Sequence, residues 1–398
     1  MKRIIFVIGD LNLGGAEKSL VRLCAQLNED KYDISVLSLF GRKCPLSEYL
    51  PEYVKQYYVS REKTISFAKQ YSSVWMKIYF FSTNKLWSKK RTNNKVLRFI
   101  YRVFLRIENK HFISYVKNLF KSIPFDISVG CLEGLPSVVS TNCFSCNKRF
   151  IFYAHGSVDG YYGDDDAFEK CDRLIAKSEK LKENIIRIKN YNPQKIIVLH
   201  NVYDIENIKK QSLETADLIE DTKSLHIITV GRFHPDKGQI SAILAAAKLK
   251  SNGVDFLWIF VGNDKGEYAE FCKQKVVELG LENNIVFTGS RINPYPYFRI
   301  CNIYVQPSKC EALPGTVVEA LILEKPIVST KTYGALELIK DGDNGLLCGF
   351  EPDDIYRRIM ELVSNYELRE KLIEGSRKTT TLLEHEIEKY DKLFLSND

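Results

Sequence analysis

Short apolar runs alternate with longer amphipathic stretches along most of the chain. The first run, residues 4–8, is continuously apolar, which is typical of a strand buried on both faces of a parallel sheet, and a helical spacing follows it. Six further strand-like runs occupy the first half: 34–39, 57–60, 126–130, 149–155, 173–178 and 195–200. Their alternation with helical segments predicts a doubly wound α/β domain with a parallel sheet.

A second series of the same kind follows residue 224. Its strand-like runs and helical patterns are, in order, 226–230, 238–250, 255–261, 267–279, 284–288, 294–301, 303–307, 315–323, 326–330, 333–339 and 345–348. A chain of 398 residues exceeds what one hydrophobic core normally serves. We therefore predict a first domain over residues 1–203, a polar linker over 204–224, and a second α/β domain over 225–375.

An insertion over residues 72–121 breaks the alternation in the first domain. Between Lys77 and Lys121 it carries twelve basic residues and one acidic residue, Glu108, among many aromatic and aliphatic side chains. Its arginines at every fourth position form one stripe on a helix: Arg98, Arg102 and Arg106. A basic amphipathic helix with aromatics is typical of an anionic membrane surface. A solvated helix face is the alternative, and nucleic-acid binding is disfavoured because no recognition motif accompanies the charge.

Composition and cysteine usage indicate the cellular compartment in which the protein works. The net charge of +7 comes from 57 basic and 50 acidic residues, so the excess is mild outside the insertion. The ten cysteines are scattered, and the pair Cys143 and Cys146 has no second ligand pair at metal-site spacing, so we interpret it as structural. No signal-peptide pattern precedes the first strand, and no uncharged apolar run reaches about 18 residues. We expect a cytoplasmic protein with reduced thiols.

The densest chemistry lies between residues 306 and 321. Glu311 falls in the loop after the strand at 303–307, and Glu319 lies in the following helix. In an open parallel sheet, ligands bind at the carboxyl ends of the strands. The exposed N–H groups near Gly315 add positive charge for an anion such as a phosphate. Two hydroxyl acceptors beside an anion seat suit a sugar nucleotide.

Other strand ends add cations and glycine turns. Arg232 and Lys237 follow the first strand of the second series, where two cations could clamp a diphosphate. Gly262 and Gly289 end the next strands with turns on the same edge. In the first half, Gly14-Gly15 follows the first strand and His155 ends the strand at 149–155. For each of these groups alone, a solvated loop or a core histidine remains the alternative interpretation.

Together these motifs resemble family 4 of the retaining glycosyltransferases. The most specific are the glutamates of the E-x7-E stretch, Glu311 to Glu319, and the segments 325–330 and 341–347 that follow it. The resemblance implies a GT-B fold, in which two Rossmann-like domains face a central cleft. It also implies that a C-terminal helix, residues 376–398, crosses back to the first domain.

The resemblance implies a role for each matching residue. Glu319 would hold the ribose hydroxyls, Glu311 would contact the donor sugar, and Arg232 with Lys237 would bind the diphosphate. Further donor contacts and the residue facing the sugar would come from Gly14, Gly15, His155, Gly262, Gly289, Leu313, Pro314 and Gly315. The expected catalytic set is His155, Glu311, Arg232 and Lys237.

The resemblance further implies transfer of a hexosyl or N-acetylhexosaminyl group with retained configuration, without a metal or other cofactor. The donor would be a nucleotide-diphosphate sugar, and the acceptor a glycan or polyprenyl-linked glycan of bacterial cell-surface polysaccharide. A non-catalytic sugar-nucleotide or lipid-binding protein on the same fold is the alternative. A metal-dependent transferase is a further alternative, because the run 164–166 fits D-x-D, although acids are also favoured in a helix's first turn.

Overall fold

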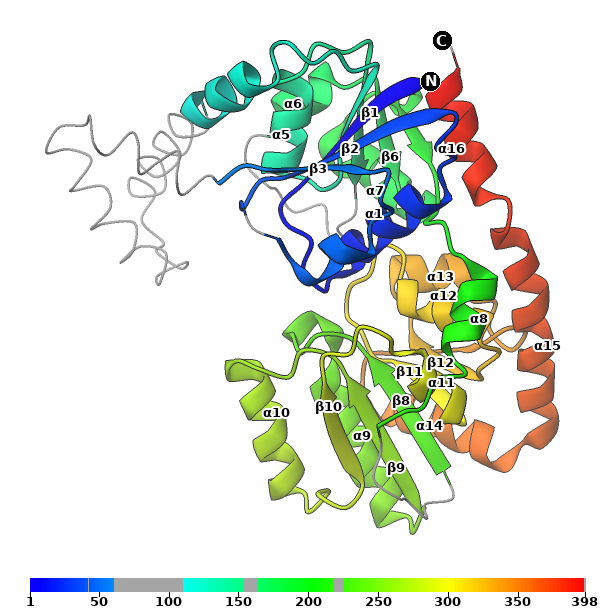
Figure 1. Cartoon of the computed structure of the whole chain (residues 1–398). Helices are drawn as coiled ribbons and strands as arrows, with labels where there is room; N and C mark the ends of the chain where they lie inside the picture. Colours follow the sequence, from blue (N-terminus) through cyan, green and yellow to red (C-terminus); the bar gives the residue numbers. More distant parts are fainter. Residues whose placement is uncertain (42, 61–109, 154–163, 218–224, 397–398) are drawn as a thin grey trace, which may run out of the picture. The chain divides into compact units, whose positions relative to one another are not determined.

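The computed structural model describes residues 1–41, 43–60, 110–153, 164–217 and 225–396. Within these residues the strands form two sheets (Figure 1), and every strand pair with a described register is parallel. The α/β prediction with two parallel sheets is therefore confirmed. Residues 72–109 of the expected basic insertion, with the stripe of arginines at 98, 102 and 106, lie outside the described residues, as does His155.

The first sheet has the strand order β3-β2-β1-β4-β5-β6-β7. Its strands are β1 (Lys2–Ile8), β2 (Tyr32–Ser38), β3 (Lys55–Tyr58), β4 (Ile127–Gly130), β5 (Lys148–Tyr153), β6 (Arg173–Ala176) and β7 (Ile196–Val198). The helices that accompany it are α1 (Gly15–Gln26), the helical residues 110–119, α5 (Leu135–Asn142), α6 (Asp164–Lys170) and α7 (Glu179–Lys189). The order reverses between β1 and β4, which creates a switch point at their carboxyl ends.

The second sheet repeats this order as β10-β9-β8-β11-β12-β13. Its strands are β8 (Leu225–Val230), β9 (Phe256–Val261), β10 (Ile285–Gly289), β11 (Ile303–Gln306), β12 (Ile327–Thr330) and β13 (Leu346–Cys348). Its helices are α9 (Gln239–Ser251), α10 (Glu267–Glu278), α11 (Tyr295–Ile300), α12 (Gly315–Ile322), α13 (Tyr333–Leu338), α14 (Pro352–Ser364), α15 (Tyr366–Leu383) and α16 (Glu386–Leu395). Here the switch point lies between β8 and β11.

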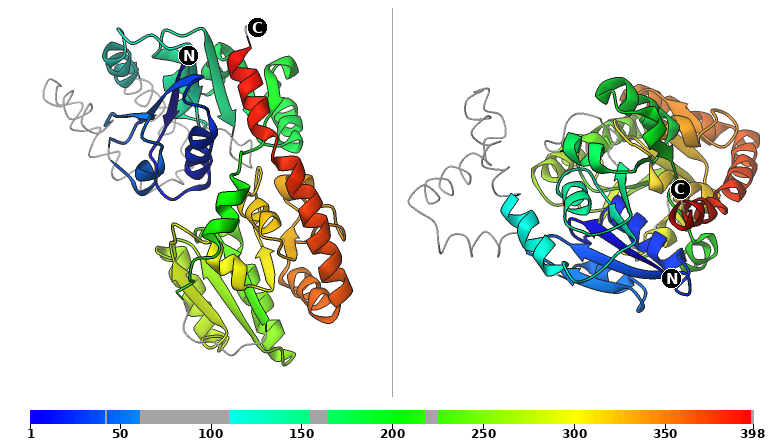
Figure 2. Two further views of the ribbon diagram at one scale, coloured as in Figure 1. Left: turned by 45° about the vertical axis from the view of Figure 1, so that its right-hand side comes forward. Right: turned by 90° about the horizontal axis from the view of Figure 1, so that it is seen from above.

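Successive side chains along the strands of the second sheet pack alternately into two hydrophobic cores, one on each face of the sheet. Trp258 and Phe260 of β9 pack on the face covered by α9, α10 and α14. Leu257 and Ile259 pack on the face covered by α8 (Ile205–Gln211), α11, α12 and α13 (Figures 1 and 2). Because successive side chains of a strand point to opposite faces, a strand buried on both faces must be apolar throughout. This explains the unbroken apolar run of β9.

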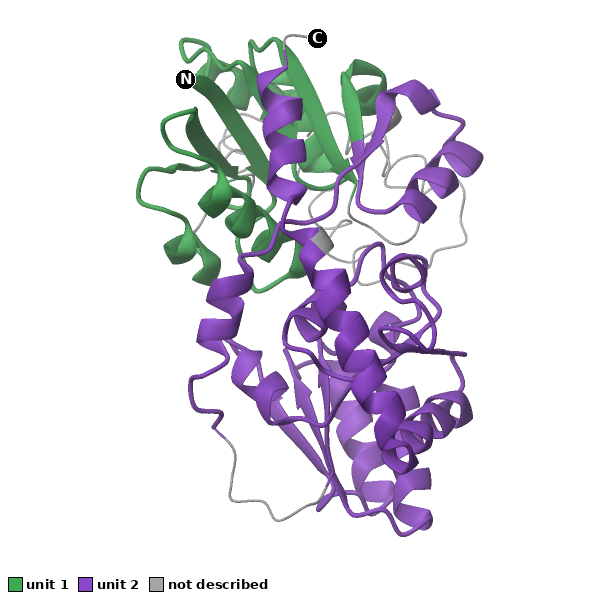
Figure 3. Ribbon diagram, turned by 90° about the vertical axis from the view of Figure 1, so that its right-hand side faces the viewer, with its two compact units in different colours: residues 1–153, 160–174 green, residues 154–159, 175–398 purple. Residues whose placement is uncertain are grey.

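The described chain divides into two compact units (Figure 3). One comprises residues 1–153 and 160–174, and the other residues 154–159 and 175–398. The division falls inside β6, and residues 175–211 are counted with the second unit. A hydrogen bond of 2.8 Å from Lys177 Nζ to Tyr390 Oη is one of the contacts that join this segment to α16. The domain limits predicted from the sequence remain predictions.

Two helical features differ from the sequence expectation. The stretch expected to be a linker begins with α8 (Ile205–Gln211), because Asp204 caps it by accepting a hydrogen bond of 3.0 Å from the Asn207 amide. Ile205 and Ile208 of α8 are buried in the second unit. The expected terminal helix over 376–398 consists instead of the end of α15 and of α16, with residues 384 and 385 between them.

The structure describes two motifs that the sequence left with more than one interpretation, the acidic run at 164–166 and the cysteine pair. Helix α6 begins at Asp164, so the acidic run occupies a helix N-terminus, as its first-turn acids predict. Cys143 is buried, and burial raises the pKa of its thiol to about 12, so the thiol stays protonated. Its partner in the motif, Cys146, contacts Ser128 Oγ at 3.4 Å. Among the described residues, no helix combines the length and the apolar character that crossing a bilayer requires.

Candidate functional site

The candidate site lies at the switch point of the second sheet. The loop after β8 carries Arg232 and Lys237, and the loop after β11 carries Glu311. Because β8 and β11 are hydrogen-bonded neighbours, these two loops start side by side. A backbone hydrogen bond of 2.7 Å from the Lys309 amide to the Asp236 carbonyl joins them. The sheet topology thus places the predicted cations and the predicted carboxylate together.

The cationic loop is folded tightly by local signals. His234 and Pro235 start a turn of 3₁₀ helix over Pro235–Lys237, and Gly238 ends it in the left-handed conformation with φ of 69°. Gln239 donates a hydrogen bond of 2.9 Å to the Arg232 carbonyl and fixes the beginning of the loop. The loop therefore has a defined shape in which Arg232 is exposed and Lys237 is partly buried.

Glycine at position 238 is required by the neighbouring loop. A Cβ atom there would lie 1.9 Å from the carbonyl oxygen of Pro307. On its other side, the Glu311 loop is held by Gly334, where a Cβ atom would lie 2.5 Å from the Ala312 carbonyl oxygen. The Gly334 amide also donates to the Glu311 carbonyl at 3.1 Å. Close packing on both sides leaves the Glu311 loop little freedom.

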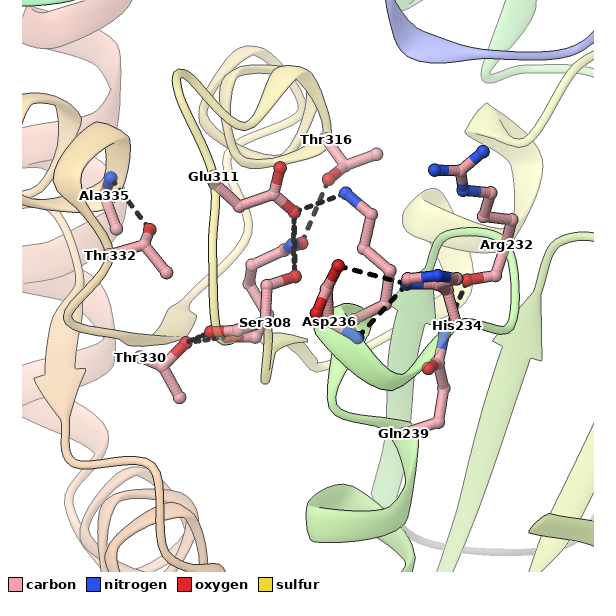
Figure 4. Close-up of polar contacts among 12 residues, drawn as sticks. Arg232, His234, Asp236, Gln239, Ser308, Glu311, Thr316, Thr330, Thr332 and Ala335 are labelled. Atoms are coloured by element: carbon pink, nitrogen blue, oxygen red, sulfur yellow. Dashed lines mark hydrogen bonds and ion pairs between the residues drawn. The ribbon is translucent and has the colours of Figure 1, made fainter. Parts of the chain in front are cut away.

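The central contact is an ion pair between the two loops (Figure 4). Lys237 Nζ lies 2.6 Å from Glu311 Oε1, and the exposed fractions of the two side chains are 28% and 13%. Arg232 makes no side-chain hydrogen bond or ion pair within the described part of the chain. One cation is therefore committed to Glu311, and a second cation beside it is available to an anion.

Helix α12 supplies the anion seat and the second carboxylate. Pro314 precedes its first residue, Gly315, and no side chain caps its first N–H groups. Leu313 and Pro314 are buried, so the loop backbone is closely packed up to the helix start. Glu319, also predicted as a donor contact, is 4% exposed. A buried carboxylate about one turn behind an anion seat can accept hydrogen bonds from hydroxyl groups.

The predicted glycine turns end the neighbouring strands β9 and β10. Gly262 has φ of 153°, and a Cβ atom there would lie 2.1 Å from the Gly231 carbonyl oxygen, at the start of the cationic loop. Gly289 is in the left-handed region with φ of 72°. The Gly262 amide donates to the Gly289 carbonyl at 3.0 Å, so both turns belong to the same sheet edge.

In the first unit, Gly14 and Gly15 begin α1 at the end of β1. A Cβ atom on Gly14 would lie 2.1 Å from Glu17 Oε2, whereas no described atom lies within 4 Å of a Cβ position on Gly15. Glycine at 14 thus makes room for the Glu17 carboxylate at the helix start. No contact among the described residues requires glycine at 15, and its role in donor binding stays a prediction.

Several polar residues near these switch points were not predicted from the sequence. Glu133 follows β4, and it is 5% exposed. A buried acid in an α/β loop carries no local sequence signal, because its burial depends on strands distant in the chain. The unpredicted residues that touch the Glu311 loop are Tyr304, Gln306, Ser308, Thr316 and Thr330.

The chain resembles known proteins in sequence. The sequence family described as glycosyl transferases group 1 matches residues 210–379. A relative in Campylobacter jejuni, N-acetylgalactosamine-N,N'-diacetylbacillosaminyl-diphospho-undecaprenol 4-alpha-N-acetylgalactosaminyltransferase, is 26% identical over 58% of this chain and 60% of its own. The lipopolysaccharide core biosynthesis glycosyltransferase LpsE of Rhizobium meliloti is 28% identical over 38% of this chain and 44% of its own. The chain thus spans about half the length of these relatives.

The fold is shared over the full length of solved structures. Anabaena Alr3699/HepE, solved in complex with UDP and glucose, has a TM-score of 0.72 and 17% identity and covers 100% of both chains. At that identity the likeness establishes the fold, and the sequence match identifies the part of the chain that carries the candidate site. The chain therefore has the GT-B fold, and its residues 210–379 match the family described as glycosyl transferases group 1.

Proposed function

We propose that this protein is a retaining glycosyltransferase that moves a sugar from a nucleotide-diphosphate sugar to a glycan or lipid-linked acceptor. The observation that supports it best is the pairing of Lys237 with Glu311 at 2.6 Å, beside the uncapped start of α12. A cation, a hydroxyl acceptor and an anion seat meet at one switch point. These are the groups that a diphosphate attached to a sugar requires.

Each donor group has a matching partner in this arrangement. The diphosphate would bind Arg232, Lys237 and the amides of residues 313–315, while Glu319 would accept hydrogen bonds from the ribose hydroxyls. Glu311 would accept from a hydroxyl of the transferred hexosyl or N-acetylhexosaminyl group. Because two cations can stabilise the charge that develops on the departing diphosphate, we propose that the reaction needs no metal.

The chemical step we propose is a front-face displacement. The bond from the sugar's anomeric carbon to the phosphate oxygen breaks, and a bond to the acceptor oxygen forms on the same face. The acceptor's hydroxyl proton passes to the departing phosphate oxygen, so the products are the nucleoside diphosphate and the glycoside with unchanged configuration. His155 would face the sugar, and Gly14 with Gly15 would allow close backbone approach to the ligand.

The names of two relatives support the acceptor class. One acts on a diphospho-undecaprenol glycan and the other in lipopolysaccharide core biosynthesis. The basic aromatic stretch around Arg98, Arg102 and Arg106 suits an enzyme that works at an anionic membrane surface. We therefore propose a peripheral enzyme at the cytoplasmic face of the membrane in bacterial cell-surface polysaccharide synthesis.

A thermal-shift screen over UDP-, GDP-, ADP- and dTDP-sugars tests the donor class. We expect one nucleotide series to raise the melting temperature, and the NMR spectrum of the product to show the donor's anomeric configuration. An inverted product contradicts retention. Binding without any transfer, across a panel of lipid-linked acceptors, favours the non-catalytic alternative, and loss of activity in EDTA that Mn²⁺ restores contradicts a metal-free reaction.

Two carboxylate variants separate binding from turnover. Glu311→Gln should lower kcat by about 10² to 10³-fold, since it weakens an interaction with the reacting sugar. Glu319→Ala should instead weaken affinity for the nucleoside diphosphate, by about 10 to 100-fold for a lost charge-assisted hydrogen bond. Glu282→Gln, an exposed position outside the site, is the control. Unaltered nucleotide affinity in Glu319→Ala contradicts its assignment.

A further inference from the structure

A chain of buried polar side chains lies beneath Glu311. Gln306 is 3% exposed, and Tyr304 and Ser308 are each 0% exposed. Gln306 Nε2 donates to Glu311 Oε1 at 2.9 Å and to Ser308 Oγ at 2.6 Å, and Ser308 Oγ donates to the same carboxylate oxygen at 2.8 Å. Buried polar groups are costly unless they are paired, so this side-chain network is a specific feature of the site.

The other end of the Gln306 amide fixes its orientation. Gln306 Oε1 accepts hydrogen bonds from Thr316 Oγ1 at 3.0 Å and from the Tyr304 hydroxyl. Burial raises the pKa of Tyr304 well above its ordinary value, so the phenol remains a neutral donor. Two hydroxyls therefore occupy both lone pairs of the amide oxygen, and the amide N–H groups must face Glu311 and Ser308.

The network leaves the two oxygens of Glu311 unequal. Oε1 receives hydrogen bonds from Lys237, Gln306 and Ser308, whereas Oε2 makes no hydrogen bond to any residue that the structure describes. Figure 4 shows the contact that joins Ser308 to Glu311. One oxygen is thus an anchor, and the other can accept from a substrate hydroxyl.

Lys237 alone could not hold Glu311 in this way. An arriving diphosphate attracts the Lys237 ammonium, and a carboxylate tied only to that ammonium would follow it or turn. Gln306 and Ser308 are neutral donors, and the backbone of their loop is held by Thr330, whose hydroxyl donates to the Gln306 carbonyl at 3.2 Å and to the Ser308 carbonyl. They keep their contacts with Oε1 when the cation engages phosphate.

We propose that Gln306, oriented by Tyr304 and Thr316, is a positioning residue that anchors Glu311 through Oε1 and presents Oε2 to the donor sugar. The inference rests on the proposed function, because it assigns Glu311 to the sugar. It adds that the side-chain amide of Gln306 links the hydroxyl of Thr316, in the first turn of α12, to the Glu311 carboxylate. A change at Gln306 should therefore affect the sugar contact and leave the nucleotide contact intact.

Gln306→Leu removes both ends of the amide at similar size. We expect kcat to fall by about 10²-fold, as for misplacement of a catalytic group, with affinity for the nucleoside diphosphate within about threefold of the wild type. Calorimetry should compare two ligands, the panel sugar nucleotide that binds the wild type and its parent nucleoside diphosphate. We expect the variant to bind both with similar affinity, because the sugar no longer contributes to binding.

Gln306→Glu provides a readout inside one folded protein. Its carboxylate can still accept from Tyr304 and Thr316, but it donates to Glu311 only when protonated, and burial beside another carboxylate raises its pKa. Turnover should therefore be low at pH 8 and recover as the pH falls, which shifts the pH optimum in the acid direction. A residue that merely fills the core produces no such shift.

Thr229→Val is the matched control. Thr229 is 3% exposed in the adjacent strand, and its hydroxyl donates to the Val305 carbonyl at 2.9 Å and accepts from Trp258 Nε1 at 3.1 Å. It loses buried polar contacts in the same sheet without touching Glu311. We expect reduced stability in this variant, with turnover and its pH optimum unchanged.

The outcomes separate this inference from the proposed function. If Glu311→Gln abolishes turnover while both Gln306 variants keep wild-type kcat and pH optimum, the positioning role is wrong and the proposed function stands. If Glu311→Gln keeps full turnover and sugar affinity, the role of Glu311 is wrong, and the inference falls with it. Loss of turnover in Gln306→Leu with an acid-shifted optimum in Gln306→Glu supports both.

Discussion

At the scale of single residues, backbone conformation and close contact make separate demands on glycine. Gly238 and Gly253 have similar positive φ angles of 69° and 73°. A Cβ atom on Gly238 would meet the Pro307 carbonyl at 1.9 Å, whereas no described atom lies within 4 Å of the same position on Gly253. The two glycines therefore share a backbone conformation and differ in whether a Cβ atom would collide with a neighbouring residue.

Gly253→Ala should lower the free energy of unfolding by about 1–2 kcal/mol, the cost of a left-handed residue with a side chain. Gly238→Ala should cost about 1–3 kcal/mol more, because the Cβ atom collides with backbone that cannot move away easily. Urea unfolding followed by fluorescence measures both. Equal losses in the two variants would mean that the loops after β8 and β11 are not pressed together as the structure has them.

At the scale of elements, one partly buried ionic cluster joins three helices of the second unit to the segment after β7. His200 Nε2 lies 2.7 Å from Glu337 Oε1 of α13, and its Nδ1 lies 3.5 Å from Glu386 Oε1 of α16. Glu337 also accepts from the Glu179 amide at the start of α7, at 2.6 Å. The other charged or titratable groups that face the cluster are Lys389 on Glu386, and Lys177 with Tyr390, whose hydroxyl donates to the His200 carbonyl.

The cluster sets a pH window for stability. Burial alone would lower the pKa of His200, but hydrogen bonds and charges from Glu337 and Glu386 outweigh it and raise the pKa to about 9. Burial likewise opposes ionisation of Glu386, yet His200 and Lys389 lower its pKa to about 2. The histidine contribution is full below its ordinary pKa of 6.5 and is lost as the pH rises through 9. The glutamate contribution is full above its ordinary pKa of 4.5 and is lost as the pH falls through about 2.

We therefore expect the free energy of unfolding to fall between pH 6.5 and pH 9, by on the order of 2 kcal/mol after allowance for solvent screening. His200→Gln keeps a hydrogen-bonding side chain but cannot titrate, so its stability should change much less across this range. His385→Gln is the control, because His385 pairs with Glu388 at 3.1 Å on the exposed surface. A wild-type curve that stays flat to pH 9 would show that the cluster is not charged as described.

At the scale of the whole molecule, local patterns predicted the elements, and chain topology decided what they form together. Continuous apolar runs marked strands such as β9, since burial on both faces leaves a pattern in consecutive residues. Arg232, Lys237 and Glu311 were placed in strand-end loops, and strand order then brought two of them into contact. Helix α8 was missed although its capping residue Asp204 is visible, because the surrounding polar stretch outweighed that signal.

What the sequence could not show depends on distant partners. His200 meets Glu337 and Glu386 across 137 and 186 residues, so no local pattern announces the cluster. In the sequence, Gln306 has no feature that distinguishes it from other strand residues. Its burial beside the hydroxyls of Tyr304, Ser308 and Thr316 follows only from the pairing of β11 in the sheet. Both cases have the same cause. The fold decides which polar side chains are buried, and it also brings the hydrogen-bonding partners that offset the free-energy cost of burying them.

The basic stretch of the chain should bind an anionic membrane surface. The basic stretch between Lys77 and Lys121 holds a larger charge excess than the chain's net +7, so the charge is local rather than global. Binding to vesicles with anionic lipid should weaken with salt, and reversal of Arg98, Arg102 and Arg106 to glutamate should reduce it by more than about 10²-fold, at about 1 kcal/mol per basic residue removed.

A matched reversal separates the stretch from overall charge. Replacing three exposed lysines of the second unit by glutamate, Lys371, Lys378 and Lys392, changes the net charge equally. Sedimentation with vesicles of phosphatidylglycerol and phosphatidylcholine should find this variant bound like the wild type. If both triple variants lose binding to the same degree, only net charge matters, and if neither loses it, the basic stretch does not hold the protein at the membrane. Selective loss in the arginine variant places the proposed transferase where a polyprenyl-linked acceptor would present its glycan.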